Sequence, residues 1–347
     1  MISRAWRKPL KAWRDLDSAS SVMGPALAER QPLVPIGDAQ PGHVSVLYEE
    51  VLEGLAVQPG GRYVDGTLGA GGHTEGILER SGPDGQVLGL DADPDAIGRT
   101  RRRLDRFSDR AILVQSNFRH LADVARKHGW TTVDGIVLDL GLSSPQLASA
   151  HRGFSFATAG PLDMRFDPTG SMATAADIVN TASQEELSRI FFEYGEERAA
   201  RRIARWIVEA RARAPITTTI QLAELVRRAK GFSGRIDPAT QVFQALRIGV
   251  NDELGSLREI LPQAIALLRP GGRLAIIAFH SLEDRMVKQY FRQEARSCVC
   301  PPTQPTCTCA HQPVLRLITR GALQAGPAEV SANRRARSAR LRVAERL

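Results

Sequence analysis

The stretch YVDGTLGAGGHT, residues 63–74, places four glycines directly after an apolar pair and an aspartate. A glycine-rich turn of this kind is typical of a site that holds a nucleotide-like ligand. A loop for a nucleoside triphosphate needs a lysine and a hydroxyl residue after its last glycine, whereas His73 and Thr74 follow here. A dinucleotide-binding loop reads G-x-G-x-x-G, and this stretch fits that spacing poorly. The turn therefore points away from both phosphate-bearing ligands.

The charge of Asp65, just before the glycines, also bears on which ligand the turn can hold. An acid at this position would repel a pyrophosphate seated on the N-terminus of the following helix, and it suits a ligand with a cationic end. S-adenosylmethionine has an ammonium, a sulfonium and a ribose, and it has no phosphate. The spacing D-x-T-x-G-x-G at residues 65–71 resembles the first motif of Rossmann-like methyltransferases, with Thr67 where a glycine is more usual. The turn favours S-adenosylmethionine as the ligand.

Short apolar runs alternate with helical stretches from residue 43 onward, which predicts an α/β fold around a parallel sheet. The expected strands are Tyr63–Asp65, Val87–Leu90, Ile112–Val114, Ile136–Leu140 and Leu274–Phe279. The long gap between the last two contains helical sequence, which predicts a helical domain inserted in the sheet. We expect a disordered extension at 1–40, a methyltransferase domain formed by 41–146 and 246–347, and an inserted helical substrate-recognition domain at 147–245. Near the end, VLRLIT and ARLRVAE are expected to pair as a hairpin that closes the sheet.

Two further strand ends carry candidate contacts to a nucleoside. Asp91 ends the second expected strand, nineteen residues after Gly72, where an acid commonly holds ribose hydroxyls. Enzymes that bind nicotinamide dinucleotides share this feature, so Asp91 indicates a nucleoside rather than a methyl donor. Phe118 follows the third strand and can lie against an adenine, with ordinary core packing as the alternative. Asp139 ends the fourth strand in LDLGLSSPQL, a loose version of the motif in methyltransferases that modify exocyclic amines.

Composition limits the class of protein. Apolar residues make up 43% and charged residues 24% of 347 residues, which is typical of a globular protein, and no apolar run approaches the length of a membrane span. The net charge of +8 favours a polyanionic partner. Only five of the 46 basic residues are lysine. Arginine binds phosphate and stacks on bases, so this bias favours RNA. A GC-rich coding bias accounts for it equally well, and both explanations stay open.

Nine motifs in order give the sequence a specific resemblance. They are HVSVLYEEV, YVDGTLGAGGHT, LDADPDAI, LDLGLSSPQL, RGFSFATAGPLDMRFDP, YGEERAARRIARWIV, QVFQALRIGVNDEL, PGGRLAIIAFHSLEDRMVK and NRRARSARLRVAER. From about His43 to the C-terminus the chain resembles the ribosomal RNA small subunit methyltransferase H family. The resemblance implies a Rossmann-like class I S-adenosylmethionine-dependent methyltransferase sheet with an inserted all-helical domain. It also implies methylation of the exocyclic N4 of a cytidine in the decoding (P-site) region of 16S rRNA.

The resemblance further implies a set of site residues and partners. Its cofactor contacts fall on Gly71, Gly72, His73, Asp91, Phe118, Asp139 and Gln146. Asp139 and His280 are the candidates for a catalytic role, and a helix cap is the alternative for Gln146. The implied partner is 16S rRNA in the small ribosomal subunit, and no membrane is involved. The protein is expected in the cytoplasm, as a monomer or homodimer. A nicotinamide oxidoreductase, another amino-methyltransferase and a ribosome assembly factor without turnover remain as rival functions.

All four cysteines lie in CVCPPTQPTCTC, residues 298–309, which the family pattern does not require. Four thiolates this close could hold a structural zinc ion, although two C-x-C pairs are not the usual C-x-x-C spacing. Reduced thiols on a surface loop and a redox-labile disulfide pair are the alternatives. Cys298, Cys300, Cys307 and Cys309 are the candidate ligands of such an ion.

Overall fold

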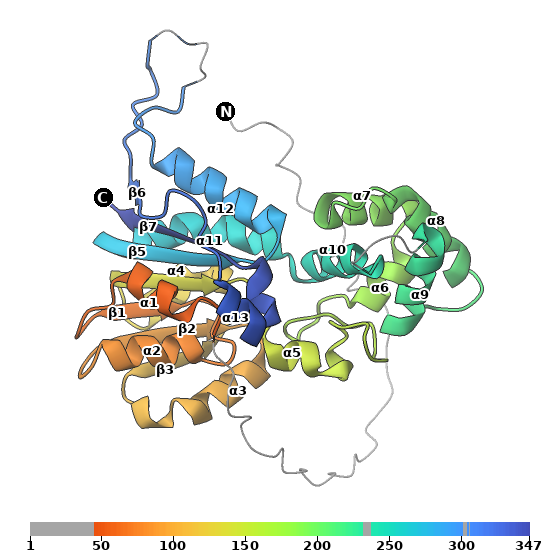
Figure 1. The fold of residues 1–347 in the computed structure, drawn as a ribbon, viewed down its shortest axis with the longest axis horizontal. Coiled ribbons are helices and arrows are strands. Elements are labelled where there is room, and N and C mark those ends of the chain that lie inside the picture. Colours follow the sequence, from red (N-terminus) through yellow and green to blue (C-terminus); the bar gives the residue numbers. More distant parts are fainter. Residues whose placement is uncertain (1–44, 232–236, 301–303, 305) are drawn as a thin grey trace, which may run out of the picture. The chain divides into compact units, whose positions relative to one another are not determined.

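A computed structural model describes residues 45–231, 237–300, 304 and 306–347. The extension expected at 1–40 lies outside these residues. The fold is built on one seven-stranded sheet with the order β3-β2-β1-β4-β5-β7-β6 (Figure 1). Its strands are β1 Arg62–Asp65, β2 Gln86–Asp91, β3 Ala111–Gln115, β4 Val133–Asp139, β5 Leu268–Ala278, β6 Leu315–Leu317 and β7 Arg340–Arg346.

The five strands expected from the sequence are confirmed, and they pair with one another in parallel. The strand order reverses between β1 and β4, which makes their carboxyl ends the crevice where ligands bind in open α/β sheets. The expected pairing near the C-terminus is also confirmed, because β7 runs antiparallel to both β5 and β6. The link from β6 to β7 is not a tight turn, since it contains helix α13, Pro327–Ala332.

Helices cover both faces of the sheet (Figure 1). The apolar side chains of the sheet are buried in two core layers beneath them. One core layer lies under α4, α11 and α12, and the other lies under α1, α2 and the segment that leads into β7. The bounds of these covering helices, with α3 beside β2 and β3, are α1 Tyr48–Leu55, α2 Gly72–Arg80, α3 Pro94–Arg103, α4 Leu121–Lys127, α11 Glu253–Leu267 and α12 Ser281–Glu294. None of the helices in the described part of the chain is long and apolar enough to cross a membrane.

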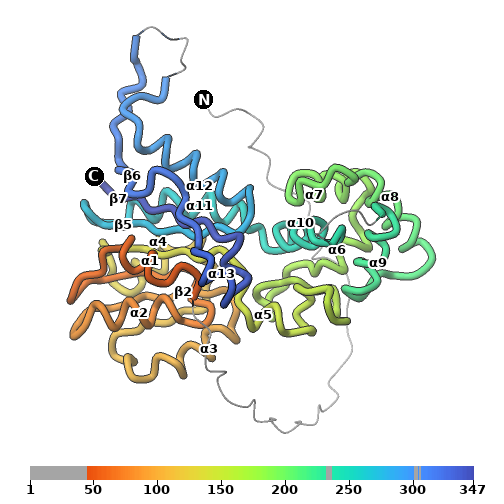
Figure 2. The backbone as a smooth tube through the Cα atoms, viewed as in Figure 1, coloured from red at the N-terminus to blue at the C-terminus, as the bar shows by residue number. Residues whose placement is uncertain are grey.

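The connection from β4 to β5 is mostly helical, as Figure 2 shows along the chain. After the short α5, Ser144–Ala148, it contains α6 Ala175–Thr181, α7 Gln184–Gly195, α8 Ala200–Arg211, α9 Thr219–Lys230 and α10 Ala239–Asn251. Helix α7 packs on α8 and α10, and α8 packs on α9. The Asp237-Pro238 pair precedes α10, and the Asp237 carboxylate accepts the Ala239 N–H at 2.9 Å. The expected boundary at residue 245 falls inside α10, which ends at Asn251.

The glycine-rich loop joins β1 to α2 and is shaped by contacts within the chain. Gly71 has φ of 78°, and a Cβ added there would lie 2.4 Å from Thr100 Cγ2. A Cβ at Gly72 would lie 2.1 Å from Ser45 Oγ. The sequence suggests that a side chain at these positions would collide with the ligand. In the structure, the first collision is with the protein itself.

Replacement of Gly71 tests this packing. We expect Gly71→Ala to lower the free energy of unfolding by about 1–3 kcal/mol, because alanine is strained at positive φ and its Cβ has no room. Gly98→Ala is the matched control, since Gly98 lies within α3 and a Cβ there would meet nothing within 4 Å. Alanine should leave stability unchanged there or raise it by up to about 1 kcal/mol. Urea unfolding measures both variants, and equal midpoints would contradict this description of the loop.

Candidate functional site

A pocket opens where the carboxyl ends of β1, β2 and β4 meet, at the reversal of strand order. Its volume is roughly 700 Å³ when the solvent-filled opening is counted with it. The loops after these strands form one side, and residues around α10, α11 and α12 form the other. The lining residues are Gly66, Thr67, Gly69, Asp91, Ala92, Asn117, Phe118, Asp139, Leu140, Gly141, Ser143, Gln146, Phe166, Asn251, Glu253, Ser256, Leu257 and Glu283.

Asp91 is held rigidly at the pocket wall by two backbone donors. One carboxylate oxygen accepts the Gly69 N–H at 2.7 Å, and the other accepts the Asp93 N–H at 2.8 Å. Each oxygen has a second lone pair, so the carboxylate can still accept two ligand hydroxyls. Burial raises the pKa of Asp91 to about 6, against the two backbone hydrogen bonds, which lower it. Asp91 is therefore a fixed carboxyl group that is mostly ionised at neutral pH and loses its charge as the pH falls through about 6.

Asp93, two residues further on, ties three segments together. Its carboxylate is fully buried and accepts hydrogen bonds from Gln146 Nε2 at 3.0 Å and from Arg152 Nη1 at 2.8 Å. It also caps α3 by accepting the Asp95 N–H. Gln146 completes a capping box with Ser143 at the start of α5. The loop after β2 and the loop after β4 are thus joined beneath the pocket by a buried ion pair.

The loop that precedes α6 supplies Phe166 to the far side of the pocket. The Asn251 side chain fixes this loop, because its Oδ1 accepts the Phe166 N–H at 2.7 Å and its Nδ2 donates to the Met164 carbonyl at 2.7 Å. Asn251 is the last residue of α10, and it is buried. The end of α10 therefore determines where an aromatic ring faces the pocket.

Two glutamates extend the acidic lining. Glu253 starts α11 and forms a two-pronged ion pair with Arg247, at 2.8 and 2.9 Å. Burial raises the pKa of Glu253, although Arg247 opposes this shift. Glu283 lies in the first turn of α12, and although burial raises its pKa, His280 and its hydrogen bonds hold that pKa below the usual value. With Asp91 and Asp139, four carboxyl groups from four separate segments line one pocket.

Asp139 ends β4 at the centre of the crevice. Its backbone N–H donates to Thr67 Oγ1, which links the β4 end to the glycine-rich loop. Burial raises the pKa of Asp139, and the nearby His73 and Arg335 oppose that shift. Arg335 itself donates to Ser144 Oγ at 2.8 Å and to the Leu142 carbonyl. A C-terminal arginine thus holds the loop after β4 in place.

The structure divides the site residues expected from the sequence into two groups. Asp91, Phe118, Asp139 and Gln146 line the pocket together. Gly71, Gly72 and His73 are not among its lining residues, and the His73 ring is buried with Nε2 at 3.1 Å from the Val46 carbonyl oxygen. Asp65 also faces inward, where it accepts the Thr67 N–H and the Thr74 hydroxyl. The sequence assigns Asp65 the negative charge that would suit a cationic ligand. In the structure, other carboxyl groups supply that charge to the pocket.

His280, the second catalytic candidate, is the N-cap of α12. Its Nδ1 accepts the Glu283 N–H at 3.4 Å, and its Nε2 lies 3.1 Å from a Glu283 carboxylate oxygen. The helix begins at Ser281 and has Glu283 and Asp284 in its first turn. Ser281 donates to Glu196, which follows α7, and Arg285 pairs with the same glutamate at 2.8 Å. His280 therefore touches the pocket through Glu283 rather than lining it.

Sequence reasoning missed several residues that shape the site. Asp93 and Arg152 were absent from the expected set, although LDADP contains the cap-then-proline signal of a helix start at Asp93-Pro94. Phe166, Asn251 and Glu253 were also absent, because they are distant in sequence and no local pattern connects them. Their motifs, RFDP and GVNDEL, lie in the segments quoted for the family resemblance.

Known proteins resemble this chain over most of its length. The chain is 57% identical over 306 residues to the ribosomal RNA small subunit methyltransferase H of Thermomicrobium roseum, covering 88% of this chain and 94% of that protein. It is 56% identical to the protein of the same name in Syntrophotalea carbinolica, covering 88% and 98% of the two chains. A solved rRNA methylase from Streptococcus thermophilus aligns with 12% identity and a TM-score of 0.39, over 88% of this chain and 99% of that one.

The family profile matches residues 40–347, which include every described residue. The family and fold expected from the sequence are confirmed, and so is a methyltransferase that uses S-adenosylmethionine. The chain belongs to the MraW methylase family.

Proposed function

We propose that this protein transfers a methyl group from S-adenosylmethionine to the exocyclic N4 of a cytidine in the P-site region of 16S rRNA. The observation that carries the proposal is the acidic pocket at the reversal of strand order, lined by Asp91, Asp139, Glu253 and Glu283. Relatives named ribosomal RNA small subunit methyltransferase H, at 56–57% identity, support the choice of substrate.

The charge of the pocket favours this methyl donor over a dinucleotide. Four carboxyl groups would repel the pyrophosphate of a nicotinamide cofactor, and they attract a ligand that carries a sulfonium and an ammonium. Asp91 is placed to accept the ribose hydroxyls, as acids at this position do in related nucleoside sites. Phe118 and Leu257 offer apolar surface for the adenine. We assign Gly71, Gly72 and His73 to the support of this site, through the turn that they form.

The chain's own groups must position the nucleophile and accept its proton. The N4 lone pair of cytosine is delocalised into the ring, so the amine reacts only when it is held in line with the methyl group. The bound methyl donor supplies an electrophilic methyl group on a positively charged sulfur. Asp139 is placed to accept a hydrogen bond from N4 and then the proton that N4 loses, because burial raises the pKa of this carboxyl group. We assign His280 a positioning role through Glu283.

The segment 147–245 is our candidate for the substrate-recognition domain. Arg198 lies just before α8, and Arg201, Arg202 and Arg205 lie on it; all four are exposed. In the C-terminal tail, Arg334 and Arg337 line a second hollow, whereas Arg335 and Arg342 bond to the protein itself. Exposed arginines of this kind bind phosphates without reading sequence. We place the reaction in the cytoplasm, where the small ribosomal subunit is found.

Methyl transfer to small ribosomal subunits tests the proposed function. Subunits from a strain that lacks the endogenous enzyme should gain about one labelled methyl group each from S-adenosylmethionine, at N4 of one P-site cytidine, as read by nuclease digestion and mass spectrometry. Asp139→Asn should reduce the transfer rate at saturating S-adenosylmethionine at least about 100-fold, because general base catalysis is worth about 10²–10⁴-fold. RNA binding without transfer would favour an assembly factor and would contradict the proposal.

The arginines of α8 provide a separate arm of the same assay. Arg201→Ser with Arg205→Ser should raise the KM for subunits and weaken its dependence on salt, since each lost phosphate contact lowers that slope. Affinity for S-adenosylmethionine should stay unchanged. An unchanged KM would remove α8 from the substrate surface but leave the chemistry standing.

Asp91 predicts a pH dependence of cofactor binding. The carboxylate form accepts ribose hydroxyls, and the pKa of the free protein's Asp91 is raised to about 6. Affinity should therefore be fully present above about pH 7 and fall as the pH drops through 6. Asp91→Asn should bind about 10- to 150-fold more weakly at pH 7.5, and its affinity should lose the step near pH 6. Titration calorimetry measures both, with the exposed Asp105→Asn as control; an Asp91→Asn variant with wild-type affinity would refute the assignment.

A further inference from the structure

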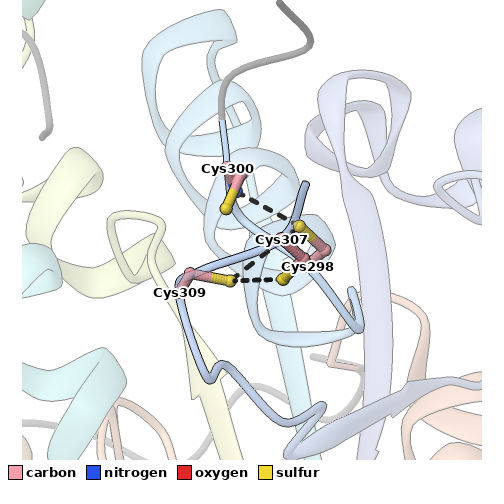
Figure 3. Close-up of side chains that lie close together, drawn as sticks. All are labelled: Cys298, Cys300, Cys307 and Cys309. Atoms are coloured by element: carbon pink, nitrogen blue, oxygen red, sulfur yellow. Dashed lines mark hydrogen bonds between the residues drawn. The ribbon is translucent and has the colours of Figure 1, made fainter. Parts of the chain in front are cut away.

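The four cysteines lie together in the connection between α12 and β6 (Figure 3). None of them lines the pocket. They come from two C-x-C pairs that are separated by six residues, and their sulfur atoms all lie within 4.8 Å of one another. We propose that Cys298, Cys300, Cys307 and Cys309 bind one Zn²⁺ ion in a structural site.

The spacing of the sulfur atoms fits a tetrahedral metal site. Zn–S bonds are about 2.3 Å, so two sulfurs on a tetrahedral zinc lie roughly 3.8 Å apart. The Cys309 and Cys298 sulfurs are 3.8 Å apart, and those of Cys307 and Cys309 are 3.5 Å apart. A disulfide needs about 2.05 Å, and all four residues are free thiols in the structure. The arrangement therefore matches coordination better than cross-linking.

Backbone donors face these sulfurs. The Cys300 N–H donates to Cys298 Sγ at 3.4 Å, and the Val299 N–H donates to Cys309 Sγ at 3.5 Å. Such donors orient the ligands of a metal site and offset the negative charge of thiolates. Four thiolates form a soft donor set, which selects zinc over calcium or magnesium.

The surrounding segment lacks another source of stability. Among the described residues from Ala295 to Val314, none is buried, and the Val299 side chain is 40% exposed. The ends of the segment are joined where the Val314 N–H donates to the Glu294 carbonyl at 2.9 Å. Zinc binding can supply folding free energy that a small loop cannot obtain from an apolar core.

The position of the cluster indicates a structural role. Glu283, at the start of α12, lines the pocket, whereas the cysteines follow the end of that helix. A helix of 14 residues is about 21 Å long, which separates the metal from the reacting atoms. Four protein ligands also leave no open position for a substrate. The ion would hold the loop between α12 and β6 without taking part in methyl transfer.

Metal content and thiol reactivity test the site without reference to activity. The full chain, purified untagged under reducing conditions without chelators, should contain about one zinc per chain by plasma mass spectrometry. Because the chain has only four cysteines, a chromogenic thiol reagent reports on this cluster alone. All four thiols should be protected in the metal-loaded protein and react after a chelator is added. Cobalt added to the metal-free protein should give the absorption of a tetrahedral thiolate complex.

Variants separate the site from general folding. The quadruple Cys→Ser variant should bind no zinc and melt several degrees lower, with unchanged affinity for S-adenosylmethionine. Thr308→Ser, between two of the cysteines, should keep the zinc. Protein free of metal with four reactive thiols and no cobalt complex would overturn the proposal, as would iron in place of zinc. Either result would leave the proposed function untouched, because neither readout depends on methyl transfer.

Discussion

The buried carboxylate of Asp93 is the constraint on which the site depends. Asp93 is the N-cap of α3, two residues after the end of β2. Its carboxylate pairs with Arg152 at 2.8 Å and accepts a hydrogen bond from Gln146, so it joins the loops that follow β2 and β4. Its backbone N–H also fixes Asp91. Removing one partner of a buried ion pair costs about 3–5 kcal/mol, because the other charge stays buried without compensation. The segment that holds Asp91, which we propose binds the ribose, and the entry into the helical segment are therefore joined at Asp93.

The other carboxyl groups of the pocket make it favour a positively charged ligand. Asp139, Glu253 and Glu283 reach it from β4, α11 and α12, so no single segment determines its acidity. Burial raises the pKa of Asp139 and Glu253, which shows that the pocket holds negative charge at a cost. A cationic ligand lowers that cost, and a phosphate would increase it. The buried negative charge of the pocket therefore favours the methyl donor over a phosphate-bearing cofactor.

Sequence patterns predicted the parts of this molecule that are local. The five parallel strands and the strand-end acids Asp91 and Asp139 follow from apolar periodicity and topology. The Asp93–Arg152 pair and the hold of Asn251 on Phe166 could not be predicted, since these partners are 59 and 85 residues apart. Asp65 shows the converse, because its place before the glycines suggested a ligand contact, whereas Thr67 and Thr74 satisfy it. Local patterns locate strand ends but do not show which side chains turn inward.

A double-mutant cycle on Asp93 and Arg152 tests the central claim most directly. Urea unfolding and titration with S-adenosylmethionine would be measured for Asp93→Asn, Arg152→Met and the double variant. If the pair holds the pocket, each single change lowers stability by about 3–5 kcal/mol and weakens cofactor binding. The double variant should then be little worse than either single one, with a coupling of at least about 2 kcal/mol. Additive losses of stability, with cofactor affinity unchanged in all three variants, would contradict it.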